Sequence, residues 1–145
     1  VVNPYWHVPR SIATRELLPE IRAKPGFLAM NDYTVWTPDG LRVDPRTVDW
    51  ASLGRRNFPY TIRQEPGDDN ALGRVKIMFP NAFNVYLHDT PSKSLFGRAA
   101  RAFSHGCIRV GRPFELAAEL LRPQGIDQLH SAAPGDRLQP GSRSD

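Results

Sequence analysis

The chain has 145 residues, of which 40% are hydrophobic and 23% charged, with a formal net charge of +4 at pH 7. These values are ordinary for one globular domain, and no apolar run approaches the roughly 18 residues of a membrane-spanning helix. The composition therefore predicts a single domain without a membrane span.

Arginine dominates the basic residues. The chain holds three lysines, Lys24, Lys76 and Lys93, against sixteen arginines. Arginine favours planar, bidentate recognition of carboxylates or phosphates, although arginines that only decorate the surface are an alternative. Because they are scattered, with no basic block interleaved with aromatic residues, nucleic acid is not an expected partner.

Pro and Gly number 14 and 11, which predicts many turns and short elements. The first ten residues, VVNPYWHVPR, open on an apolar pair typical of the end of a strand, without the pattern of a signal peptide. We therefore expect a mature or cropped chain whose first strands are missing.

Short helices are expected next. Residues 11–26 (SIATRELLPEIRAKPG) predict one or two of them, between a cap at Ser11 and a stop at Pro25-Gly26. Residues 27–58 predict irregular structure with turns at TPDG and DPRTVDW, typical of an insertion that lies over another part of the molecule.

Alternating patterns predict strands in the middle of the chain. Residues 60–64 (YTIRQ) and 74–79 (RVKIMF) each fit one strand. In residues 84–90 (NVYLHDT), Tyr86 and His88 fall on the face opposite the apolar positions. We therefore expect His88 to project away from the core, toward an open space.

The last third predicts one clear helix. Residues 91–103 read as a loop with one helical turn, and residues 112–125 (RPFELAAELLRPQG) as a helix with Pro113 near its start. The composition of residues 131–145, rich in Ser, Pro, Gly and Arg, predicts a flexible tail.

The motif SHGCIRV at residues 104–110 contains the only cysteine. A free cysteine is often a small buried hydrophobe, but Cys107 has polar neighbours, with His105 two residues before it and Arg109 two residues after. Gly106 allows a tight turn whose N–H groups point into one space, as an oxyanion hole requires. The motif therefore favours a nucleophile.

A thiol needs a base or a positive field to become a thiolate near neutral pH. We expect His88, at the end of a separate strand, to be the general base. His105 is expected either to support the reacting groups without touching the substrate or to lie beside the oxyanion. A zinc site made by these two histidines with Asp89 and Cys107 is an alternative. The single thiolate and the lack of CxxC or HExxH disfavour it.

His88, fifteen intervening residues and the run Ser104-His105-Gly106-Cys107-Ile108-Arg109 resemble the signature of the L,D-transpeptidase (YkuD) catalytic domain. Stretches such as NPYWHVPRSI, QEPGDDNALGRVKIMFPN and VYLHDTPSKSLF are similar to its large periplasmic, YcbB-like branch from Gram-negative bacteria. The similarity covers most of residues 3–121.

The resemblance implies a β-rich fold, mainly β or α+β: an L,D-transpeptidase-like β-sandwich with short helices. It also implies a catalytic domain at residues 1–130 without its N-terminal strands, a capping insertion over the active site at residues 13–58, and a flexible tail at residues 131–145.

The resemblance further implies a peptidoglycan L,D-transpeptidase in the periplasm, with a role in cell-wall biogenesis and cell shape. Such an enzyme forms 3-3 cross-links between tetrapeptide stems, releases D-alanine, uses no cofactor or metal, and is acylated by carbapenems. The implied catalytic residues are the nucleophile Cys107, the general base and acid His88, and His105 and Gly106 at the oxyanion. The implied substrate-binding residues are Tyr86, Asp89, Ser104 and Arg109.

The acyl acceptor stays open at this stage. Water would make the protein an L,D-carboxypeptidase, whereas a D-amino acid or a protein amine would make it an exchange enzyme or a relative that attaches or removes lipoproteins. A cell-wall binding module that keeps the fold without catalysis is the alternative from a different functional class.

Overall fold

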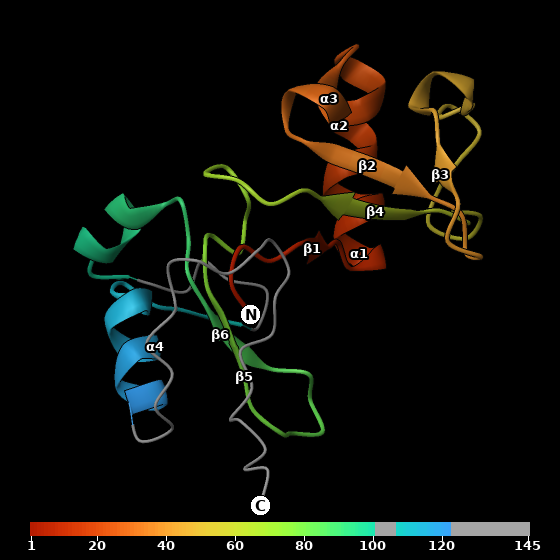
Figure 1. The fold of residues 1–145 in the computed structure, drawn as a ribbon. Helices are drawn as coiled ribbons and strands as arrows, with labels where there is room; N and C mark the ends of the chain where they lie inside the picture. The colour runs from red at the N-terminus through yellow and green to blue at the C-terminus, as the bar shows by residue number, and fades with distance from the viewer. Residues whose placement is uncertain (101–106, 123–145) are drawn as a thin grey trace, which may run out of the picture. The chain divides into compact units, whose positions relative to one another are not determined.

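The computed structural model describes residues 1–100 and 107–122, which form two compact units (Figure 1). The N-terminal unit comprises Trp6–Glu65, and the C-terminal unit comprises Val1–Tyr5 with the described residues from Pro66 onward. No helix in these ranges is both long and apolar enough to cross a membrane.

The helices of the N-terminal unit confirm the helical structure predicted for residues 11–26, but the cap expected at Ser11 is wrong, because Ser11 lies inside the first helix and Pro9 is the N-cap. Helix α1 (Arg10–Ile12), the π-helical segment η1 (Ala13–Leu17) and α2 (Leu18–Ala23) follow one another, and α3 (Phe27–Met30) begins after Gly26. Pro19 has no N–H to give to a carbonyl four residues earlier. The preceding Leu18 N–H reaches back five residues to the Ala13 carbonyl, so a wider turn precedes the proline.

The sheet of the N-terminal unit is antiparallel, with the strand order β1-β4-β2-β3. Its strands are β1 (Trp6–His7), β2 (Tyr33–Trp36), β3 (Arg42–Val43) and β4 (Thr61–Gln64). Strand β4 confirms the strand expected at residues 60–64. The irregular structure expected for residues 27–58 is wrong at β2 and β3, which pair with each other. The turn between them is held by a hydrogen bond from the Gly40 N–H to the Thr37 carbonyl at 3.0 Å.

An apolar cluster stabilises the N-terminal unit. Phe58 and Ile62 are 1% and 0% exposed, and they pack with Val8, Ile12, Ala13, Leu17 and Leu18. The predicted insertion at residues 13–58 falls inside this unit and includes the 3-10 turn η2 (Pro45–Thr47). The role of the insertion as a cap stays a prediction.

The C-terminal unit contains a three-stranded mixed sheet. Strands β5 (Lys76–Met78) and β6 (Tyr86–His88) are antiparallel, and β7 (Ile108–Arg109) runs parallel to β6 at the other edge. Both strands expected from alternation are confirmed. The described elements thus form mixed and antiparallel sheets with short helices, consistent with a β-rich or α+β fold.

Two helical elements of the C-terminal unit also match the sequence prediction. The 3-10 turn η3 (Lys93–Gly97) lies in the expected loop, and α4 (Pro113–Leu121) is the expected helix. Helix α4 packs through Phe114, Ala117 and Leu121 on a small apolar cluster with Val2, Val75 and Ile77. The tail expected at residues 131–145 lies outside the described residues.

Candidate active site

The parallel pairing of β6 and β7 brings the sequence-predicted residues together. His88 lies opposite Arg109, and the Val110 N–H donates to the His88 carbonyl at 2.8 Å. Because side chains alternate along a strand, Tyr86 and His88 share one face, and their ring centroids lie 5.9 Å apart. Cys107, two residues before Arg109, belongs to the same face.

Tyr86 contacts the candidate nucleophile directly. Burial, the negative charge of a Cys107 thiolate and a hydrogen bond between the Tyr86 hydroxyl and the Cys107 sulfur raise the pKa of Tyr86 to about 12. The phenol therefore keeps its proton at neutral pH and donates to the sulfur. Cys107 is half-buried, and as the single cysteine of the chain it has no partner for an internal disulfide.

A backbone carbonyl sets the tautomer of His88. The Nδ1 atom of His88 is hydrogen-bonded to the Asp89 carbonyl oxygen. A carbonyl can only accept, so the proton of the neutral ring lies on Nδ1, and Nε2 keeps the lone pair of a base. His88 projects away from the apolar cluster, as expected, but it is 6% exposed, so the expectation of an open space beside it is wrong.

The surroundings of His88 favour the neutral ring. Burial is the largest cause that lowers the pKa of His88, and the positive charges of Arg109 and Lys76 lower it further. The hydrogen bond to the Asp89 carbonyl and the Asp89 charge act in the opposite direction without reversing the result. Neutral imidazole, the form that can take a proton from a thiol, therefore dominates at neutral pH.

Lys76 is a site residue that sequence reasoning missed. It lies opposite His88 on β5, and its ammonium group lies 3.9 Å from the centroid of the Tyr86 ring. Arg109 supplies a second positive charge from β7, and its buried Nε has no hydrogen-bond partner among the residues that the structure describes. The sequence carried no signal for Lys76, because its place beside His88 follows from the pairing of β5 with β6.

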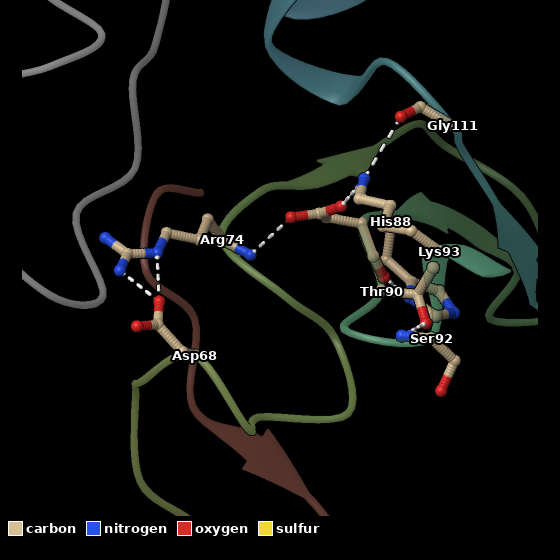
Figure 2. Close-up of polar contacts among 8 residues, drawn as sticks. Asp68, Arg74, His88, Thr90, Ser92, Lys93 and Gly111 are labelled. Atoms are coloured by element: carbon tan, nitrogen blue, oxygen red, sulfur yellow. Dashed lines mark hydrogen bonds and ion pairs between the residues drawn. The ribbon is translucent and has the colours of Figure 1, made fainter.

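Asp89 is buried beside His88 and holds neighbouring segments together. Its carboxylate accepts hydrogen bonds from the Arg74 N–H at 2.9 Å and from the Lys93 ammonium group. Lys93 also donates to the Gly111 carbonyl at 3.1 Å, as Figure 2 shows. Burial alone would raise the pKa of Asp89, but these hydrogen bonds and the Lys93 charge outweigh it and lower the pKa. The substrate-binding role of Asp89 stays a prediction.

Three predicted site residues, Ser104, His105 and Gly106, lie outside the described residues. The oxyanion hole expected from His105 and Gly106 therefore stays a prediction. Within the described ranges, no group of three His, Cys, Asp or Glu side chains is arranged to hold a metal ion. The zinc alternative includes His105, so it is not tested by this geometry.

Comparison with known proteins agrees with the sequence motif. The family model for YkuD, the L,D-transpeptidase catalytic domain, matches residues 1–136. A Haemophilus influenzae protein named "Putative L,D-transpeptidase" is 42% identical over 125 residues, which cover 86% of this chain and 25% of that protein. The chain thus spans about a quarter of the length of this relative. It belongs to the YkuD family of L,D-transpeptidase catalytic domains.

Proposed function

We propose that this chain is a cysteine acyltransferase of the periplasm that forms 3-3 cross-links in peptidoglycan. One observation carries the proposal: the pairing of His88 with Arg109 across β6 and β7 puts Cys107 on the sheet face that also presents Tyr86 and a neutral His88 with a lone pair on Nε2. Nucleophile and base on one face are what acyl transfer through a thioester requires. Membership of the YkuD family supports the same chemistry.

In the first half-reaction, Nε2 of His88 takes the proton of the Cys107 thiol. The sulfur attacks the carbonyl carbon between the third residue of a tetrapeptide stem, diaminopimelate, and its terminal D-alanine. A carbon–sulfur bond forms, the amide carbon–nitrogen bond breaks, and His88 returns the proton to the amine of the leaving D-alanine.

In the second half-reaction, the side-chain amine of another stem attacks the thioester. A carbon–nitrogen bond forms and the carbon–sulfur bond breaks. The proton that the amine loses passes through His88 back to the sulfur, so the enzyme returns to its starting state. Lys76 and Arg109 provide positive charge for the developing thiolate and for carboxylates of the stems.

The remaining predictions extend this proposal. We propose further that the chain belongs to the YcbB-like branch, that its fold is an L,D-transpeptidase-like β-sandwich, and that residues 13–58 are a capping insertion. Ser104 and Arg109 contact the donor stem, and the backbone of residues 105–107 stabilises the oxyanion.

Intact-mass spectrometry tests the proposal. The wild-type chain and its Cys107→Ala variant are incubated separately with a carbapenem and with a tetrapeptide muropeptide. We expect a covalent adduct on the wild-type chain alone, together with release of D-alanine from the muropeptide. Circular dichroism confirms that both proteins are folded.

The products identify the acceptor. A cross-linked dimer of stems supports transpeptidation, and a tripeptide stem alone identifies water as the acceptor and a carboxypeptidase. A folded wild-type chain that binds peptidoglycan as well as the Cys107→Ala variant, without any adduct, contradicts the enzyme proposal and favours a binding module.

A further inference from the structure

Beyond the reacting groups, the structure points to a device that orients the base. We propose that Asp89 and Lys93 are positioning residues that hold His88 in the tautomer with its proton on Nδ1. They act through the Asp89 carbonyl, which accepts a hydrogen bond from that Nδ1–H group. The inference rests on the proposed role of His88 as general base, and the name "Asp89–Lys93 clamp" is used below for this pair.

The carbonyl that the clamp controls lies at the end of the sheet, where residue 89 keeps one backbone hydrogen bond to the neighbouring segment. Strand β6 ends at His88, and the Asp89 N–H donates to the Val75 carbonyl at 2.8 Å. The Asp89 carbonyl has turned from the ladder toward the imidazole of its own neighbour. Its direction therefore depends on what holds the rest of residue 89.

The carboxylate of Asp89 provides that restraint through donors that lie before and after it in the chain. The Arg74 N–H, just before β5, donates to Oδ2 at 2.9 Å, and the Lys93 ammonium group donates to Oδ1. Lys93 also donates to the carbonyl of Gly111, beyond the end of β7, at 3.1 Å. The clamp thus connects the three segments that carry Lys76, His88 and Arg109, as Figure 2 shows for Arg74, Lys93 and Gly111.

Close packing fixes the position of the carboxylate further. Gly73 has a φ of +60°, and a Cβ added there would lie 2.5 Å from the Asp89 Cγ. Only glycine lets the backbone approach this closely. Asp89 is therefore held by its donors on one side and by bare backbone on another.

The identity of residue 93 fits this role. In a chain with sixteen arginines, a lysine stands where one ammonium group must reach a carboxylate and a carbonyl together. An ammonium group is compact and has three donors, whereas guanidinium is planar and suits bidentate pairing with one partner.

The chain offers a matched control for this pair. Lys24 and Glu20 form an ion pair with the same four-residue spacing, at 2.6 Å, and both side chains are exposed on α2 and just beyond it in the N-terminal unit. An exposed pair of this kind contributes little to stability, and it lies in the other unit from His88. Lys24→Met therefore reproduces the change of Lys93→Met without touching the clamp.

Long-range proton–nitrogen NMR of the imidazole rings tests the inference. The spectra are recorded on wild type, Lys93→Met and Lys24→Met, above the pH at which His88 titrates, and His88→Gln assigns the signals. We expect His88 of wild type and of Lys24→Met to be protonated on Nδ1, and Lys93→Met to gain the tautomer protonated on Nε2. Lys93 is 48% exposed on its side chain, so its replacement should not unfold the chain.

The rate of acylation of Cys107 by a carbapenem is the second readout. We expect Lys93→Met to lose about 10-fold, less than the 10²-fold that a misplacement of about 1 Å costs, and Lys24→Met to lose nothing. Should Lys93→Met fail to fold, Asp89→Asn carries the same test, because its amide oxygen still accepts from the Arg74 N–H while the charge that holds Lys93 is gone.

The two readouts separate the clamp from the proposed function. An unchanged His88 tautomer in folded Lys93→Met overturns the clamp, whatever the acylation rate. A shifted tautomer together with full acylation by His88→Gln supports the clamp but removes His88 as the base, so the proposed mechanism fails instead.

Discussion

In the N-terminal unit Phe58 and Ile62 are buried in an apolar cluster, whereas at the end of β6 in the C-terminal unit three polar residues, His88, Asp89 and Thr90, are buried. Apolar burial stabilises strongly but without direction, so it fixes which elements pack more than where one atom lies. Buried polar groups need partners at defined angles and distances. The candidate active site therefore lies where the restraints are directional.

The largest expected effect concerns the buried polar side of this comparison. His88→Gln should lower the rate of Cys107 acylation by about 10²- to 10⁴-fold, because the general base is lost. A time course by intact mass measures the rate, and circular dichroism checks the fold. A rate within a few-fold of wild type would show that another group takes the proton of the thiol.

The next largest effect concerns the apolar cluster of the N-terminal unit, where we expect a loss of stability. Phe58→Ala should lower the free energy of unfolding by about 3–5 kcal/mol, because it removes a buried ring from the cluster and leaves a cavity. Phe83→Ala is the matched control, since Phe83 is 85% exposed and its truncation should change stability by less than about 0.5 kcal/mol. Urea denaturation measures both, and equal effects would contradict the packing described for Phe58.

Two glycines with positive φ sharpen the comparison further. At Gly40, φ is +86° and no atom lies within 4 Å of an added Cβ, so Gly40→Ala should cost only the backbone strain of about 1 kcal/mol. Gly73→Ala adds a clash with the Asp89 carboxylate, which should cost about 1–3 kcal/mol more and slow acylation of Cys107. Unfolding curves and acylation rates are compared, and equal stability of the two variants would contradict the close approach at Gly73.

Much of the fold could be predicted because its elements have clear periods. Alternation identified β5 and β6, and Pro113 with an apolar helical pattern identified α4. Strands β2 and β3 were missed because turn residues such as Asp32, Pro38 and Gly40 surround them and dominate the local pattern, although β2 is as long as β4. Their stability comes from pairing with each other and with β4, a tertiary property.

The residues of the candidate active site likewise divide into those that the sequence predicted and those that only the structure revealed. Tyr86, His88 and Cys107 could be chosen from local chemistry and a family motif, and strand register then placed them together. Lys76 and Lys93 could not, because their roles depend on the pairing of Lys76 with His88 and on the turn that brings Lys93 to Asp89. Neither contact leaves a pattern in the sequence.

The smallest expected effect concerns the charges around His88. The pKa of His88 lies below its usual value near 6.5, so between the two values the unfolded chain binds more protons than the folded chain. The contribution of His88 to the free energy of unfolding is therefore present above about pH 6.5 and lost as pH falls toward the folded pKa.

Lys76→Met removes one positive charge that lowers this pKa, the weakest of the causes after burial and Arg109. The pKa of His88 should rise toward its usual value, so the acid limb of the acylation rate should move to higher pH while the loss of stability in acid becomes smaller. NMR titration of His88 and acylation rates measured against pH check the two shifts, with Lys24→Met as the control for loss of a lysine charge. Because one altered pKa governs both, acylation and stability must move in these opposite directions, and a shift in only one of them would mean that a group other than His88 controls the acid limb.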